Sequence, residues 1–205
     1  MRVRAGARAR LATYRGGPRL TGWWPLAVYG ALLFALFVRF VDPAITRRPL
    51  QLRATPAELR LVRIHHRLFY AILIAAPIEW ALRGRPAGCP QLLAAALFLA
   101  GVIGYRRAGA ALGEQLSPLL APREPAALVE RGPYRHVRHP MYGAQLAMAL
   151  GAPLTLGAVA TSALALGLAL VLRRRMAIEE RLLGERLPAY DAYVRRTSRL
   201  VPRVY

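Results

Sequence analysis

The residues best suited to chemistry lie in the stretch Arg131–Tyr142 and in the acid pair Glu179-Glu180. The stretch reads RGPYRHVRHPMY and concentrates tyrosine, histidine and arginine side chains. Tyrosine rings offer faces to flat or cationic groups, whereas arginine and histidine pair with anionic groups and carboxylates with cationic ones. Because a long apolar segment follows directly, this combination indicates a site at a membrane surface.

The apolar segment that follows, Met141–Leu172, has 32 residues and no charge. One helix across a bilayer needs about 20 residues, so this run is too long for one straight span and barely long enough for two. A turn is expected near its middle, at Gly151, Pro153 and Gly157. We predict a hairpin of two helices, and one kinked, tilted helix is the alternative. The hairpin would bring Arg138-His139-Pro140, the RHP residues, next to Arg173-Arg174-Arg175 and the acid pair.

Three further apolar segments precede the hairpin, at Trp23–Val41, Leu68–Leu82 and Gln91–Tyr105. Thr55-Pro56-x-Glu58 has the pattern of a helix start, with Thr55 as cap. We therefore expect an all-α, polytopic membrane protein with about five transmembrane helices, a C-terminal helical hairpin and a cytoplasmic terminal helix. The chain would divide into a basic tail (1–22), membrane helices with their connections (23–125) and a C-terminal catalytic region (126–205), which includes the hairpin at 141–172.

The chain of 205 residues is strongly basic, with a net charge of +20. Such a charge in a soluble protein would favour nucleic acid as a partner. Here 56% of the residues are hydrophobic and the arginines flank apolar runs, so anionic lipid headgroups and the positive-inside rule account for the charge. We expect membrane lipids as partners, no nucleic acid, and the segments 42–67, 106–139 and 173–205 on the cytoplasmic side of a bacterial inner membrane.

Cysteine and histidine usage gives little support to a metal centre. Cys89 is the single cysteine, which excludes an internal disulfide and a cysteine-based metal site. His65 and His66 are adjacent, and neighbours on a helix point in different directions, so the two rarely bind one ion. We therefore expect no metal.

The C-terminal part of the chain contains a series of motifs: Leu128-Val129-x-x-Gly132-x-Tyr134, Arg138-His139-Pro140-x-Tyr142-x-Ala144, Glu179-Glu180, Tyr190-x-x-Tyr193 and Leu200-Val201-Pro202. With these motifs, residues 126–205 resemble the isoprenylcysteine carboxyl methyltransferase family, integral membrane enzymes that use S-adenosylmethionine (SAM). At two places the chain departs from the family pattern: Ala126 stands where a histidine is frequent, and Leu187-Pro188 replaces Phe-Gly.

The resemblance implies a SAM pocket closed by either Glu179 or Glu180, with Arg175 facing the substrate. The spacing leaves open which of the two acids contacts the cofactor. Charge alone suggests that Arg138 or His139 pairs with the SAM carboxylate. The remaining residues implied to line the pocket are Leu128, Val129, Tyr134, Pro140, Met141 and Tyr142.

The expected reaction is methyl transfer to a lipophilic acceptor, either a carboxylate of the isoprenylcysteine type or a thiol. A carboxylate is ionised at pH 7 and needs no base, whereas a thiol must lose a proton and the sequence offers no clear base for this. Two other classes compete with this interpretation. One is a membrane NADPH-dependent reductase of the sterol or polyprenyl type, and the other is a non-enzymatic basic protein that binds anionic lipid.

Overall fold

The structure is a computed structural model that describes residues 23–40, 55–83, 88–117, 119–120 and 126–202. The predicted basic tail (1–22) and residues 41–54, which include the first half of the segment 42–67, lie outside these residues. The described part of the chain is helical and contains no β-strand, which confirms the all-α fold class. One isolated parallel bridge joins Val137 to Ser198.

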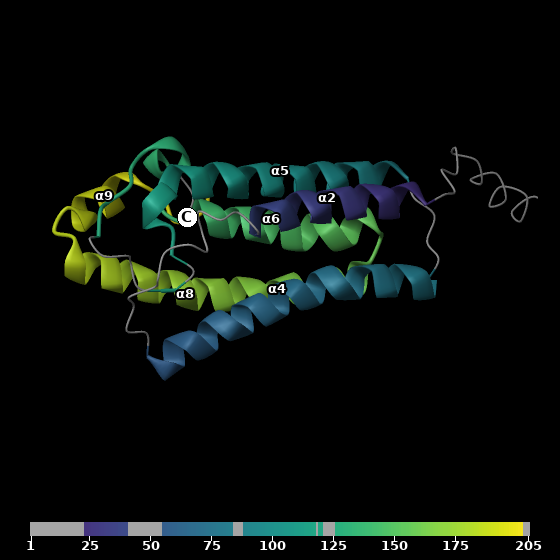
Figure 1. Cartoon of the computed structure of the whole chain (residues 1–205), viewed down its shortest axis with the longest axis horizontal. Coiled ribbons are helices and arrows are strands. Elements are labelled where there is room, and N and C mark those ends of the chain that lie inside the picture. The colour runs from purple at the N-terminus through teal and green to yellow at the C-terminus, as the bar shows by residue number, and fades with distance from the viewer. Residues whose placement is uncertain (1–22, 41–54, 84–87, 118, 121–125, 203–205) are drawn as a thin grey trace, which may run out of the picture.

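Long helices run side by side along one axis of the molecule, and successive ones point in opposite directions (Figure 1). A short helix, α7 (Val159–Ser162), links the last two, and α9 (Tyr190–Arg196) lies across one end of the bundle with the turns η1 (Gly113–Gln115) and η2 (Gly132–Arg135) nearby. The long helices are α2 (Trp24–Phe40), α4 (Pro56–Arg83), α5 (Cys89–Leu112), α6 (Pro140–Thr155) and α8 (Leu164–Arg186).

The uncharged run forms two helices, α6 and α8, that turn back at residues 156–158. Gly157 has φ 70°, a backbone conformation that favours glycine. Glu79 of α4 fixes this turn, because its carboxylate accepts hydrogen bonds from the backbone N–H groups of Ala160 (3.2 Å) and Thr161 (2.7 Å). Glu79 also pairs with Arg83 at 3.3 Å. The hairpin therefore returns the chain to the end of the bundle where α6 began.

The core lies between α4, α5, α6 and α8, with large side chains that are fully buried, among them Ile72, Phe98, Met148, Leu168 and Leu172. Helices α5 and α6 approach most closely at glycines. A Cβ atom at Gly151 would lie 2.5 Å from the backbone nitrogen of Phe98, and one at Gly101 would lie 2.9 Å from the carbonyl oxygen of Ala144. These glycines set the spacing of the two helices that carry much of the site.

Two helical segments are long and apolar enough to cross a membrane, Pro56–Arg83 and Cys89–Gln115. A shorter apolar stretch covers Trp24–Phe34 in α2. The prediction of about five transmembrane helices is thus met only in part, because α6 has 16 residues and the C-terminal half of α8 is charged.

Candidate functional site

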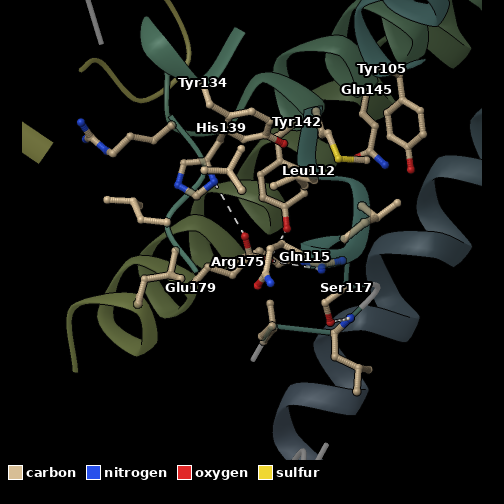
Figure 2. A pocket seen from close by; sticks show the side chains of 18 of the residues that line it. Tyr105, Leu112, Gln115, Ser117, Tyr134, His139, Tyr142, Gln145, Arg175 and Glu179 are labelled. Atoms are coloured by element: carbon tan, nitrogen blue, oxygen red, sulfur yellow. Dashed lines mark hydrogen bonds and ion pairs between the residues drawn. The ribbon is translucent and has the colours of Figure 1, made fainter. Parts of the chain in front are cut away.

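A cavity of about 250 Å³ is lined in part by Tyr190 and Tyr193 of α9 (Figure 2). It therefore lies at the end of the bundle that carries α9 (Figure 1). Its walls come from α4, α5, α6, α8, α9 and the segment before η2. The cavity collects most of the side chains that the sequence analysis selected: Leu128, Val129, Tyr134, Arg138, His139, Met141, Tyr142, Arg175 and Glu179. Pro140 and Glu180 do not line it.

The segment that carries the RHP residues is held by the C-terminal part of the chain. The backbone N–H of Arg138 donates to the carbonyl of Ser198 at 2.8 Å, and that of His139 donates to the carbonyl of Arg199 at 3.0 Å. In return, the N–H of Ser198 donates to the carbonyl of His136. Pro140 then starts α6 at its first turn, where proline fits best, and thereby sets the direction of Met141 and Tyr142.

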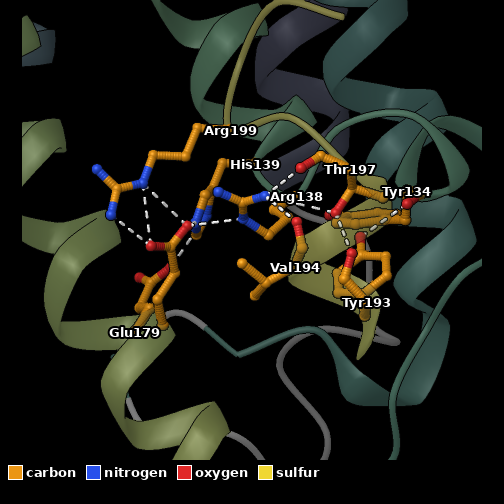
Figure 3. A network of polar contacts seen from close by, with 9 residues as sticks. Tyr134, Arg138, His139, Glu179, Tyr193, Val194, Thr197 and Arg199 are labelled. Carbon is orange, nitrogen blue, oxygen red and sulfur yellow. Dashed lines mark hydrogen bonds and ion pairs between the residues drawn. The ribbon is translucent and has the colours of Figure 1, made fainter. Parts of the chain in front are cut away.

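Glu180 belongs to a charged network beside the cavity (Figure 3). Its carboxylate accepts hydrogen bonds from Arg138 Nε at 2.9 Å and from Arg199 Nη2 at 2.6 Å, and His139 Nε2 lies 3.2 Å away. Burial alone would raise the pKa of the Glu180 carboxyl, but the hydrogen bonds from His139, Arg199 and Arg138 outweigh it and lower the pKa below its ordinary value. Arg138 also donates to the carbonyls of Val194 and Thr197, so this network ties α8 to the C-terminal segment.

Glu179 points into the cavity, as Figure 2 shows. Its carboxylate accepts a hydrogen bond from the hydroxyl of Tyr142 and one from Arg175 Nη2 at 3.3 Å, and it lies 3.7 Å from His139 Nδ1. The His139 ring stacks on the Tyr142 ring, with centroids 5.5 Å apart, and the Arg175 guanidinium carbon lies 5.4 Å from the centre of the same ring. A carboxylate, an imidazole and an aromatic ring therefore meet at one point.

Arg175 connects this group to α4. Its side chain is buried, and its Nη1 donates to Nδ1 of His65. The other nitrogen of that ring, Nε2, must then carry the proton, and it lies 3.1 Å from the acceptor oxygen of Gln145. His65 is therefore neutral in this arrangement and links α4, α6 and α8.

Several lining residues were not assigned to the pocket from the sequence. His65 and His66 were weighed only as a metal pair, and Gln145 is a single polar side chain in an apolar run. Tyr105 of α5 and the residues Gln115 and Ser117 that follow this helix had no signal either. The last two, Tyr190 and Tyr193 of α9, entered only as part of the family motif.

The phenol groups beside the cavity stay protonated at neutral pH. Burial raises the pKa of Tyr193 to about 12 and that of Tyr134 still further. The Tyr193 hydroxyl donates to the carbonyl of Tyr134 at 2.7 Å, which fixes the ring of Tyr134 in the cavity wall. These rings can therefore offer aromatic faces without adding negative charge.

Comparison with known proteins relates part of the chain to a family. Residues 90–188, which cover α5 except for its first residue, all of α6 and α8, and the RHP stretch, match the model for phospholipid methyltransferases. This segment is similar to that family. Phospholipid methyltransferases are part of the group of integral membrane methyltransferases that also contains the isoprenylcysteine carboxyl methyltransferases, so the resemblance is confirmed at the level of that group. The match supports methyltransferase activity in general, and with it a methyl donor.

A similar curated protein is the nickel-cobalt-cadmium resistance protein NccN of Alcaligenes xylosoxydans xylosoxydans. It is 29% identical over 158 residues, which cover 74% of this chain and 71% of NccN. Within the part of the chain that the structure describes, no group of three or more His, Cys, Asp or Glu side chains is arranged to hold a metal ion. The cavity is lined by apolar side chains together with aromatic, cationic and carboxylate groups.

Proposed function

We propose that the chain is a membrane-embedded, SAM-dependent methyltransferase that acts on a lipophilic acceptor. The observation that carries the proposal is the convergence of Glu179, His139 and Tyr142 in a cavity built from the segment that matches the methyltransferase family. The charged end of an apolar bundle is the place where a polar cofactor and a lipophilic substrate can meet.

The side chains that line the cavity fit SAM, which carries an ammonium, a carboxylate, an adenine ring and a sulfonium. Glu179 supplies a carboxylate for the ammonium, and the rings of Tyr134 and Tyr142 supply faces for the adenine or the sulfonium. Arg138 is already bound to Glu180 and to two backbone carbonyls, so His139 is the better-placed partner for the SAM carboxylate.

Residues outside the cavity would act through those inside it. Glu180 holds Arg138 and His139, and Pro140 sets the start of α6. Glu179 lines the cavity and Glu180 does not, which favours Glu179 as the acid that contacts the cofactor. Arg175 touches both Glu179 and His65, so we assign it to the boundary between the cofactor and the acceptor.

When bound, SAM supplies a methyl group activated by the adjacent sulfonium. The chain contributes position and exclusion of water: Tyr142 and Arg175 hold the Glu179 carboxylate, and apolar side chains form the rest of the wall. Aligned reactants can account for about 7–11 kcal/mol of a barrier, which is enough to make positioning the main contribution. The acceptor would be a lipophilic carboxylate or thiol that enters from the bilayer, with the site facing the cytoplasm of a bacterial inner membrane.

The test uses the purified chain in nanodiscs. SAM titration by calorimetry comes first, with NADPH titrated in parallel. Transfer of labelled methyl from SAM to a panel of lipophilic thiols and carboxylates follows. We expect SAM to bind and at least one acceptor to be methylated. Binding of NADPH without SAM would point to a membrane reductase instead, and binding of neither, with retained affinity for anionic vesicles, would point to a lipid-binding protein.

A further inference from the structure

One histidine of the cavity wall has no task in the proposed cofactor site. His66 lies on α4, lines the cavity and is half-buried. Its Nδ1 lies 2.9 Å from the backbone carbonyl of Val62, one turn earlier on the same helix. A carbonyl oxygen only accepts, so Nδ1 carries the proton and Nε2 of the neutral ring keeps its lone pair.

The ring geometry directs that lone pair away from the helix. Because Nδ1 is turned back to the backbone of α4, the far edge of the ring with Nε2 projects outward from the helix. The ring is held between Tyr70, which stacks on it at 6.4 Å, and His65, whose ring centre is 4.9 Å away. Among the described residues, no hydrogen-bond partner of Nε2 is found.

The other two histidines of the cavity already have roles. His65 uses both ring nitrogens, one toward Arg175 and one toward Gln145. His139 stacks on Tyr142 beside Glu179 and Glu180, and it is the residue assigned above to the SAM carboxylate. His66 is therefore the cavity histidine placed to take a proton from a bound molecule.

We propose that His66 is the general base of the methyl transfer and that the acceptor is a lipophilic thiol. This inference rests on the proposed function. The acceptor sulfur forms a bond to the methyl carbon while the carbon–sulfur bond of the donor breaks, and that electron pair stays with the donor, which leaves as a neutral thioether. The thiol proton goes to Nε2 of His66, and the resulting imidazolium returns it to water.

The choice of a thiol follows from the chemistry of the cavity. A neutral imidazole can accept a proton from a thiol, whose ordinary pKa is about 8.5, whereas an alcohol is far more weakly acidic. Arg175 reaches the α4 wall through His65 and provides a cation that stabilises a developing thiolate. A carboxylate acceptor would use neither His66 nor its lone pair, and Glu179 already lies beside Arg175.

The decisive variant is His66→Asn. The asparagine amide can still donate to the Val62 carbonyl but has no nitrogen that accepts a proton. His66→Gln, which places its amide where Nε2 lies, serves as a second variant should the first fail to fold. His136→Asn is the matched control, because His136 is exposed and does not line the cavity. All variants are compared with the wild type for SAM affinity and melting temperature in nanodiscs.

We expect His66→Asn to methylate a long-chain alkyl thiol about 10²–10⁴-fold more slowly than the wild type, the usual contribution of a general base. Added imidazole should restore part of that rate. An alkylated, electron-poor thiophenol is already ionised at neutral pH, so its methylation should change little in the same variant. His136→Asn should match the wild type with both acceptors.

A readout without turnover comes from nitrogen NMR of the imidazoles in ¹⁵N-histidine-labelled protein. We expect the His66 signal to report the Nδ1–H tautomer and to shift when a long-chain thiol is added without donor.

Three outcomes would overturn the assignment: equal rates with the alkyl thiol in wild type and His66→Asn, equal losses with both acceptors, or a wild type that methylates only carboxylates. A wild type that binds no SAM and methylates no acceptor would instead refute the proposed function itself.

Discussion

Glu179 and Glu180 are neighbours in the sequence and belong to different environments. Consecutive residues of a helix point about 100° apart, so one acid of a pair on α8 can enter a cavity while the other faces the segment beside it. Glu179 meets Tyr142 and Arg175 inside the cavity, whereas Glu180 meets Arg138 and Arg199 outside it. The two acids should therefore respond differently to the same substitution.

Glu179→Gln should weaken SAM binding without unfolding the protein. A charge-assisted hydrogen bond is worth about 1.5–3 kcal/mol, which corresponds to roughly a ten- to hundred-fold rise in dissociation constant. Calorimetric titration with SAM in nanodiscs measures this, with melting temperature as the folding control. Glu185→Gln is the matched variant on the same helix, since Glu185 is exposed and lies 3.9 Å from Arg181 in a surface pair. Equal SAM affinities for Glu179→Gln and the wild type would remove Glu179 from the cofactor site.

Glu180→Gln should lower the melting temperature, with an effect that depends on pH. The hydrogen bonds to Glu180 hold its pKa in the folded protein below the ordinary value of 4.5. The carboxylate therefore stabilises the fold fully at pH values above 4.5, and this contribution is lost as pH falls from there toward the folded pKa. The difference in melting temperature between wild type and variant should be largest near neutrality and narrow in acid. A difference that stays constant from about pH 7 to about pH 3 would contradict the role of the ionised group.

Among the single residues of the site, those that lie in sequence motifs could be predicted from the sequence, whereas isolated ones could not. The RHP stretch and the acid pair were recognisable because several chemical groups are close together in the chain. His65 and Arg175 are 110 positions apart, and only the packing of α4 on α8 makes them neighbours. His66 was considered only as part of a metal pair, since its base character depends on the tautomer that the Val62 carbonyl imposes.

At the scale of elements, the contact between α5 and α6 depends most on the absence of a side chain at single positions. Gly151 allows α6 to approach the backbone of α5 at Ala94 and Phe98, and Gly101 makes the reciprocal approach to α6. Small residues of this kind let helices pack closely inside a membrane. The first residues of α6 line the cavity. A change in the distance between α5 and α6 would therefore also move residues of the site.

Gly151→Ala should destabilise the protein by about 1–3 kcal/mol, the usual cost of overpacking. Its Cβ would lie 2.5 Å from the Phe98 nitrogen and 2.8 Å from the Ala94 carbonyl oxygen, and backbone atoms cannot move aside cheaply. Gly30→Ala in α2 is the matched control, because nothing lies within 4 Å of its added Cβ. Alanine is also the better helix former, so that control should be neutral or slightly stabilising. Melting temperatures in detergent compare the two, and equal values would contradict the tight contact.

Helix boundaries show what hydrophobicity can and cannot predict. The second apolar segment was placed at Leu68–Leu82, whereas α4 runs over the 28 residues Pro56–Arg83. Its start was visible in the cap, where the Thr55 hydroxyl oxygen accepts from the Glu58 N–H and the Glu58 carboxylate accepts from the Thr55 N–H. Likewise α5 continues past Tyr105 to Leu112. Apolar runs mark the part of a helix that suits lipid, and the helix itself continues into polar sequence.

At the scale of the whole molecule, one end of the bundle holds η2 and α9, and the other holds α7 and the start of α5 (Figure 1). The cavity lies at the first of these ends, since residues of η2 and α9 line it. The arginines that the structure describes between α5 and α6 and at the end of α8 lie at the cavity end. This distribution follows the positive-inside rule and favours a cytoplasmic site. Cys89, at the start of α5, is exposed at the opposite end.

Labelling from the two sides of the membrane tests this orientation. Arg135 on η2 and Arg195 on α9 are exposed at the cavity end, so Arg135→Cys and Arg195→Cys, each in a Cys89→Ala background, provide two single thiols there. Both should react with an impermeant maleimide only from the cytoplasmic face, whereas Cys89 in the otherwise native chain should react only from the other face. Reaction of Cys89 and the Arg195→Cys thiol from the same face would show that α5 does not cross the bilayer. If Cys89 reacts only from the cytoplasmic face and the two introduced thiols react only from the other face, the cavity lies outside. SAM from the cytoplasm could not reach it there.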